Sequence, residues 1–262
     1  MKCSMAVRLD FGRQLQRDAE ASRAVGEILT RPCFAALERI SGRRKDRWSK
    51  HAKASASLIA EYFADPAFDA VHFDTKRDDE LDASAEFESE LAGRDPASAE
   101  TAMQGYIVIP YLDADLDADR SALLALADVM QTGAGFVALE PDYRAAKRAL
   151  SSARPKERSG LSATRRLGRR ARSWKSELLA TQIATVEWGT FLGAGHLERI
   201  DLSKVRGSGA FARVVEVSPQ LAFLQVTEDP MDDLSGALEA RLPAAREALA
   251  PLLMDISDVN LD

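Results

Sequence analysis

The segment Val186-Glu-Trp-Gly-Thr-Phe-Leu-Gly193 lies in a run, 183–192, that is rich in apolar, β-branched and aromatic residues. Such residues favour a pleated and buried backbone, so the run predicts a strand. Two more apolar runs follow at 211–217 and 221–226, with Ser218-Pro-Gln220 between them. This short separation predicts a β-hairpin.

The rest of the chain mixes helical and strand patterns. Alternation of apolar and polar residues indicates strands, whereas apolar residues three and four apart indicate helices. The order lacks strict β-α-β regularity, which favours an α+β fold with mixed or antiparallel sheets and packed helices over a doubly wound parallel sheet. Strands are expected at 5–11, 68–73, 105–110 and 136–139, and helices at 15–29, 34–40, 55–63, 121–130, 143–150 and 234–253.

The length of 262 residues suits one large domain or two small ones. We expect a single α+β domain over 1–262, with a subdivision near residue 100, into 1–100 and 101–262, as the alternative. The order of elements over 105–150, which is taken up again from residue 183, also suggests two similar halves. A hydrophobic fraction of 46% supplies enough apolar material for a core.

Charge and cysteine content limit the class of protein. A formal net charge of -6 argues against nucleic acid or an anionic membrane as the default partner. Cys3 and Cys33 are too few for a disulfide framework. Residues 1–17 carry charges and no apolar core of a signal peptide, and no run approaches the length of a membrane span. We therefore expect a cytoplasmic protein.

Candidate metal ligands do not cluster in the sequence. His51, His72 and His196 are not spaced as ligand pairs, and none has a neighbouring cysteine or paired carboxylate. The run Asp113-Ala-Asp-Leu-Asp-Ala-Asp119 resembles the start of an EF-hand loop, but Ala118 and Leu124 occupy the positions that require glycine and glutamate. The run instead predicts a solvated loop that ends in a helix cap, at Asp117 or Asp119, or an acidic contact surface.

The sequence also lacks a recognisable catalytic constellation. The glycines form no phosphate-binding loop, and no G-x-S-x-G segment is present. Ser208 stands between two glycines, but no base can be assigned to it. We expect no catalytic residue and no cofactor. An enzyme whose site assembles from scattered residues remains the alternative, and a pocket with several shifted carboxylates would favour it.

A basic segment interrupts this acidic chain. Residues 151–175 contain prolines and glycines among many cations, which predicts a long surface loop. The alternative function is a nucleic-acid-binding regulator that uses 154–175, with Trp174 stacking on a base. The cationic residues are Arg154, Lys156, Arg158, Arg165, Arg166, Arg169, Arg170, Arg172 and Lys175.

The Trp-x-x-Phe-Leu pattern at 188–192, followed by a short helix at 194–199, resembles bacterial type VI secretion immunity proteins of the TsiV type. The hairpin, the terminal helix and the strand exit at 224–230 follow in the same order as in that family. Gly133-Ala-Gly-Phe-Val-Ala-Leu139 and Gly105-Tyr-Ile-Val-Ile-Pro110 extend the likeness upstream. The family often has paired glycines after the short helix, where this chain has Ile200-Asp-Leu-Ser203.

The resemblance implies an inhibitor that binds and neutralises a cognate toxin in the producing cell. The toxin is then expected to be the product of an adjacent gene. Trp188, Phe191 and Leu192 would then form core rather than contact the toxin. Such a protein needs an interface with charge complementarity. Acidic side chains are the expected partner-binding residues: Asp78, Asp79, Glu80, Asp82, Glu86, Asp113, Asp115 and Asp117.

Overall fold

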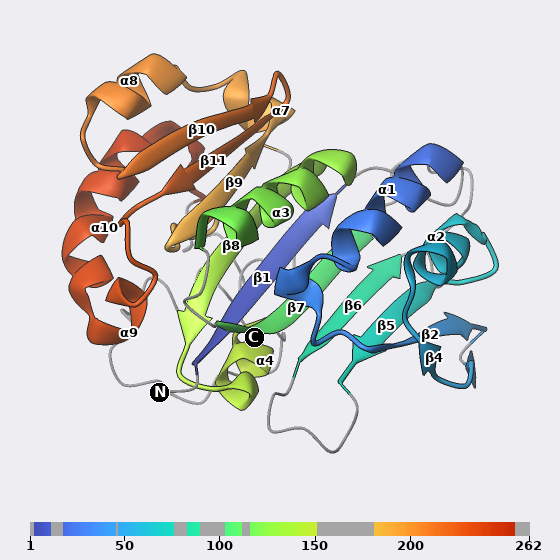
Figure 1. Cartoon of the computed structure of the whole chain (residues 1–262). Helices are drawn as coiled ribbons and strands as arrows, with labels where there is room; N and C mark the ends of the chain where they lie inside the picture. Colours follow the sequence, from blue (N-terminus) through green and yellow to red (C-terminus); the bar gives the residue numbers. More distant parts are fainter. Residues whose placement is uncertain are drawn as a thin grey trace, which may run out of the picture.

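The computed structural model describes residues 3–11, 18–45, 47–75, 83–89, 103–111, 116–150 and 181–254. A single 11-stranded sheet runs through them in the order β10-β11-β9-β8-β1-β7-β6-β5-β2-β3, with β4 paired to β2. Every pair of neighbouring strands is antiparallel. The prediction of an α+β fold with an antiparallel sheet is confirmed (Figure 1).

The strands and helices have the following bounds. The strands are β1 (Cys3–Phe11), β2 (Arg39–Arg44), β3 (Arg47–Trp48), β4 (Ala52–Lys53), β5 (Ala70–Asp74), β6 (Ser84–Ser89), β7 (Met103–Tyr111), β8 (Thr132–Glu140), β9 (Gly189–Gly193), β10 (Arg213–Ser218) and β11 (Leu221–Gln225). The helices are α1 (Ala19–Leu29), η2 (Pro32–Phe34), α2 (Ala56–Ala64), α3 (Leu116–Val129), α4 (Tyr143–Leu150), α7 (Ala194–Leu197), α8 (Leu202–Gly207), α9 (Asp232–Ser235), α10 (Ala237–Ala248) and η3 (Ala250–Leu252).

Strand β1 lies at the centre of the sheet, between β7 and β8. Its alternate residues Met5, Val7 and Leu9 are buried in the main hydrophobic core, because successive side chains of a strand point to opposite faces. Helices α1, α2 and α3 contribute to the same core and cover this face of the sheet (Figure 1). Gly26 allows α1 and α2 to approach closely, since a Cβ there would lie 2.3 Å from the carbonyl oxygen of Ala56.

A second, smaller core lies on the opposite face of the sheet. Ala6 of β1, Val108 of β7 and Phe136 of β8 pack there against Ala146 and Leu150 of α4. Helix α4 therefore covers β1, β7 and β8 on the face that α1, α2 and α3 leave free. Helix α4 covers the sheet only around its middle. The site described below lies beside α4, over β5, β6 and β7.

Two strands near the C-terminal end of the sheet, β9 and β11, are buried throughout, whereas the edge strand β10 is partly exposed. Every residue of β9 and of β11 is buried, so these strands pack on both faces. Trp188, Phe191 and Leu192 are all buried, as the sequence predicts. Asp233 of α9 accepts a hydrogen bond of 3.0 Å from the backbone N–H of Leu139 in β8.

Several sequence predictions at this end need correction. The strand expected at 183–192 is confined to β9, because the backbone of Ile183 bonds to Leu252 and Met254 instead of to a neighbouring strand. The helix expected at 234–253 is divided into α9, α10 and η3, with Pro243 inside α10 and a left-handed Gly236 before it. The predicted hairpin is confirmed as β10 and β11.

Two predictions nearer the N-terminus are also wrong. The helix expected at 34–40 is the short η2 followed by β2, because Ile40 pairs with Phe73 of β5 and the chain from Arg39 onward is drawn into the sheet. Asp117 and Asp119 both lie within the first turn of α3, so neither is its N-cap. The predicted strands in β1, β5, β7 and β8 and the predicted helices α1, α2 and α4 are confirmed in type, with boundaries that shift by a few residues.

The predictions on domain organisation stay predictions. The proposed boundary near residue 100 and the basic loop 151–175 fall outside the described residues. The idea of two similar halves stays a hypothesis as well. No helix among the described ranges has the length and apolar character that a membrane crossing requires.

Candidate functional site

Strands β2, β5, β6 and β7 carry a row of polar side chains across the sheet. The strand register aligns Ser41 with His72, His72 with Glu86, Glu86 with Tyr106, and Tyr106 with Arg8 of β1. Because directly opposed residues point to the same side of a sheet, these five side chains share one face. We call this side of β2, β5, β6 and β7 the polar face.

The polar face follows from a period-two pattern within each strand. In β6, Ala85 and Phe87 are buried against the helices, whereas Glu86 and Glu88 between and beyond them are half-buried on the other side. Phe87 packs edge-to-face against Phe63 of α2, with ring centroids 5.2 Å apart. Burial of the apolar side chains on one side thereby directs the carboxylates to the other.

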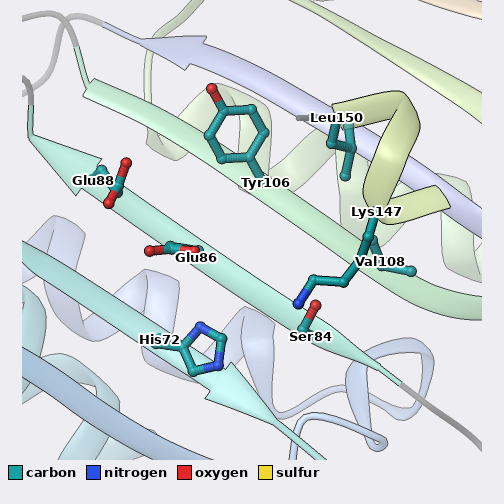
Figure 2. A pocket seen from close by; sticks show the side chains of 8 residues that line it. All are labelled: His72, Ser84, Glu86, Glu88, Tyr106, Val108, Lys147 and Leu150. Carbon is teal, nitrogen blue, oxygen red and sulfur yellow. The ribbon is translucent and has the colours of Figure 1, made fainter. Parts of the chain in front are cut away.

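A pocket of about 260 Å³ lies on the polar face where α4 ends (Figure 2). Its floor is formed by strands β5, β6 and β7, and α4 forms one wall. The volume is somewhat below the roughly 300–1,000 Å³ of typical small-molecule sites. The lining residues are His72, Ser84, Glu86, Glu88, Tyr106, Val108, Lys147 and Leu150.

Glu86 is the carboxyl group whose ionisation this pocket changes. Burial, followed by the charge of Glu88 and a hydrogen bond with it, raises the pKa of Glu86 to about 7, although Arg43 and Lys147 oppose the shift. Burial also lowers the pKa of His72, which keeps its imidazole neutral near pH 7. The pocket floor therefore combines an acid that titrates near neutrality with a neutral imidazole.

The charge of Glu88 is already paired. Arg43 of β2 donates from Nη1 to Glu88 at 3.1 Å and from Nε to Asp69 at 2.9 Å. Burial alone would lower the pKa of Arg43, but these two carboxylates raise it, so the guanidinium stays charged. Within the described ranges, no ion pair to Glu86 is formed.

Trp48 of β3 stands at the edge of the polar face. Its side chain is 45% exposed. Within the described part of the chain, no other large hydrophobic residue is exposed. The guanidinium carbon of Arg43 lies 5.6 Å from its ring centroid, and the ring of His72 meets it edge-on at 5.8 Å. Tryptophan and arginine side chains of this kind are enriched among the residues that dominate protein interfaces.

A second ion pair organises the far side of this face. Arg39 of β2 donates to both carboxylate oxygens of Asp74 in β5, at 2.7 and 3.0 Å. His51 Nδ1 lies 3.5 Å from the same carboxylate. The pairing joins the neighbouring strands β2 and β5, and a second histidine ring, that of His51, lies 6.5 Å from the ring of His72.

The predicted partner-binding residues that the structure describes lie at two separate places. Glu86 lies in the pocket on β6, and Asp117 lies in the first turn of α3, on the opposite side of the sheet. The structure does not bring these two carboxylates together. The remaining predicted contacts, Asp78, Asp79, Glu80, Asp82, Asp113 and Asp115, fall outside the described residues.

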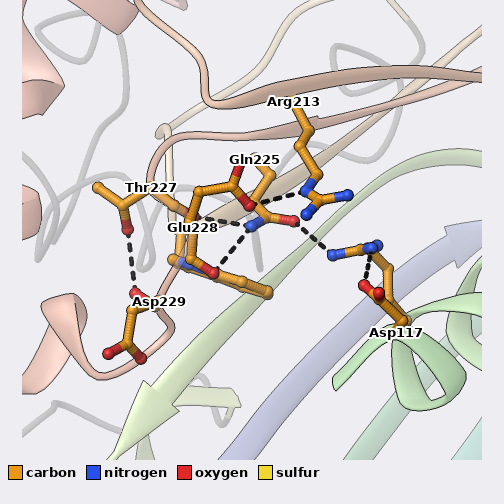
Figure 3. A network of polar contacts seen from close by, with 8 residues as sticks. Asp117, Arg213, Gln225, Thr227, Glu228 and Asp229 are labelled. Atoms are coloured by element: carbon orange, nitrogen blue, oxygen red, sulfur yellow. Dashed lines mark hydrogen bonds and ion pairs between the residues drawn. The ribbon is translucent and has the colours of Figure 1, made fainter. Parts of the chain in front are cut away.

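Asp117 belongs to a polar network that joins α3 to the C-terminal hairpin (Figure 3). It forms an ion pair with Arg120, which donates to the buried Gln225 of β11 at 3.3 Å. Gln225 donates to the carbonyl oxygen of Thr227 at 2.8 Å. Nearby, Arg213 of β10 donates to Glu228 at 2.8 Å. These contacts hold two elements together, and they assign Asp117 at least one structural role.

No group of three or more metal-ligating side chains occurs in the described ranges. His196, on α7, is completely buried. The pocket holds one carboxyl group with a resolved shift, whereas the enzyme alternative requires several. The lack of enzymatic activity stays a prediction, and the nucleic-acid alternative depends on 154–175, which the structure does not describe.

Sequence reasoning missed most of this site. From the sequence, Glu86 is expected only as one of several acidic contact residues, although Ser84-Ala-Glu-Phe-Glu-Ser89 alternates in the manner of a half-buried strand. That alternation was the available signal for β6. No local pattern connects Trp48, Tyr106 and Lys147, because the sheet register and α4 bring them together from distant segments.

The comparison with known proteins gives a likeness at the level of structure. No protein-family model matches the chain, and no curated protein does so. Among solved structures, the chain is similar to the Pseudomonas aeruginosa T6SS protein PA0821, with a TM-score of 0.58 and 12% sequence identity. The match covers 96% of this chain and 73% of that one. At this identity, the likeness shows the fold.

Proposed function

We propose that this chain is an immunity protein that binds and neutralises a cognate type VI secretion toxin in the cell that makes both. The observation that carries the proposal is the fold likeness to a T6SS protein over 96% of the chain. The likeness runs through nearly the whole chain, so it supports a common architecture and not merely a common motif. The Trp-x-x-Phe-Leu pattern at 188–192 points to the same class of protein.

The polar face supplies a surface suited to this role. Trp48 is an exposed aromatic side chain beside Arg43, and Glu86 and Glu88 provide negative charge next to them. An inhibitor of this kind needs a few anchors within a complementary surface and needs no catalytic group. We therefore assign toxin binding to the polar face, with the acidic residues outside the described ranges as further contacts.

Coexpression with the product of the neighbouring gene tests the proposal. We expect this chain to restore growth to cells that express the product, and to copurify with it. The double variant Arg43→Ala, Trp48→Ala should lose both effects, whereas Lys204→Ala, on the exposed surface of α8, should retain them. A neighbouring product that neither harms the cell nor copurifies would refute the assignment for that gene pair.

Charge reversal separates the two described acidic positions. Glu86→Lys and Glu88→Lys alter the polar face, whereas Asp117→Lys alters the network beside α3. The polar-face assignment predicts that only the first two weaken toxin binding without unfolding the protein. Equal loss in all three variants would instead favour a diffuse electrostatic contact.

A further inference from the structure

The pocket over Glu86 has the size of a site for one side chain. Its volume of about 260 Å³ is small for a cofactor or nucleotide. The ring of Tyr106, with Val108 and Leu150, gives it an apolar wall. Lysine and arginine bury their aliphatic stems along such walls and keep the cationic group at a polar end.

The polar end of this pocket can accept a cation. Glu86 has no ion pair in the described part of the chain, while Arg43 already engages Glu88. The neutral imidazole of His72, the hydroxyl group of Ser84 and the carboxyl group of Glu86 all offer acceptor atoms. A half-buried carboxyl group with acceptors around it and no paired cation is complementary to an ammonium or guanidinium group.

Lys147 is the resident cation of the pocket. Its ammonium group extends from α4 toward Ser84 in Figure 2 and lies 5.4 Å from the ring centroid of Tyr143. No ion pair of Lys147 occurs in the described ranges. Lys147 is exposed and can move aside, so it competes with an incoming cation without closing the pocket.

We propose that this pocket binds a single lysine or arginine side chain of the protein partner, with the cationic group on Glu86 and the aliphatic stem against Tyr106, Val108 and Leu150. This inference rests on the proposed function only for the identity of the partner, the toxin. The pocket itself recognises the chemistry of a cationic side chain and can be tested without the toxin.

The test uses N-acetyl-arginine amide as the probe, titrated into the ¹⁵N-labelled chain and followed by NMR. We expect chemical-shift changes centred on His72, Glu86 and Lys147, which N-acetyl-norleucine amide should not reproduce. Glu86→Gln should lower the affinity for the probe by about tenfold or more, as expected for loss of a hydrogen bond to a charged group. Glu216→Gln, at an exposed position of β10, is the matched control and should bind the probe as the wild type does.

A second variant guards against a trivial loss of folding. Lys147→Ala removes the competing cation and should raise the affinity for the probe by roughly threefold. Misfolding cannot produce such a gain. Binding should also tighten by about tenfold from pH 6 to pH 8, because Glu86, with its pKa near 7, must release its proton to pair with the probe. The same titratable and charged groups face Glu86 at both pH values: Glu88, Arg43, His72, Tyr106 and Lys147.

The outcomes separate this inference from the proposed function. Equal affinity of the probe for the wild type and Glu86→Gln, or shifts spread over the surface, would overturn the pocket assignment whatever the toxin does. If the probe binds as expected and Glu86→Gln also weakens toxin binding, the pocket assignment and the partner assignment both hold. A probe that binds to a chain that no toxin recognises would preserve the pocket and refute the immunity function.

Discussion

The two ends of the sheet differ in what covers them. At the C-terminal end, all residues of β9 and β11 are buried. At the other end, β5 and β6 bury Val71, Phe73 and Phe87 on one side and present His72 and Glu86 in half-buried positions on the other. Both ends belong to one antiparallel sheet, so strand pairing does not account for the difference.

This difference in coverage indicates which part of the sheet can present side chains to a partner. A strand packed on both faces carries apolar residues almost continuously, whereas a strand packed on one face alternates. At the buried end, β11 of the hairpin packs on both of its faces, and its outward residues are part of the core. The alternating end can change its outward residues with little cost to the core, which suits a surface that must match a particular partner.

The largest expected effect tests the buried end. Phe191→Ala should lower the free energy of unfolding by roughly 3–5 kcal/mol, because the ring is fully buried and lies 4.9 Å from the ring of Phe223. Chemical denaturation monitored by circular dichroism measures it. A loss under about 1 kcal/mol would show that this end is loosely packed and would remove the contrast between the two ends.

A smaller effect tests how α9 closes the edge of β8. Asp233→Ala leaves the backbone N–H of Leu139 without its side-chain acceptor in a buried position, and should cost about 1–3 kcal/mol. Asp233→Asn keeps an acceptor oxygen and should cost less. The same denaturation experiment compares the two variants, and an equal cost for both would indicate that charge, not the hydrogen bond, stabilises this edge.

The polar face should respond to pH in the opposite sense from an ordinary ion-paired carboxylate. The pKa of Glu86 is raised from 4.5 to about 7 in the folded chain, so its proton is held more tightly there than in the unfolded chain. The contribution of Glu86 to the free energy of unfolding therefore falls as pH rises from about 4.5 to 7. Glu86→Gln should gain roughly 1 kcal/mol relative to wild type at pH 8, after a discount for solvent screening, and nothing near pH 4.

Unfolding curves at both pH values measure this gain. Glu216→Gln, at an exposed position of β10, is the control and should show no comparable pH dependence. A Glu86→Gln variant that is less stable than wild type at pH 8 would mean that the carboxylate is already paired in the folded chain, and would count against the pocket as a cation site.

The smallest expected change in stability belongs to the side chain with the largest expected role in binding. Trp48→Ala should alter the free energy of unfolding by no more than about 0.5 kcal/mol, because the residue is exposed at the sheet edge. Calorimetric titration with the toxin should nevertheless show a clear loss of affinity. A stability loss comparable to that of Phe191→Ala would reassign Trp48 to the core.

Part of the candidate site was within reach of the sequence. Glu86 was among the predicted contacts, and the alternation around Phe87 contains the information that β6 is a half-buried strand. The helix expected at 34–40 failed for the converse reason. Ile40 has an apolar neighbourhood that fits a helix, but its pairing with Phe73, far along the chain, decides for a strand.

The sequence by itself determined the α+β class, the hairpin and the burial of Trp188, Phe191 and Leu192, because local periodicity and turn residues specify these features. Only the tertiary structure decided that β1 lies between β7 and β8, and that β2, β5, β6 and β7 align Ser41, His72, Glu86 and Tyr106 in one row. Strand order and register depend on contacts between distant segments. The charge environment of Glu86 depends on the same contacts, so no local pattern encodes it.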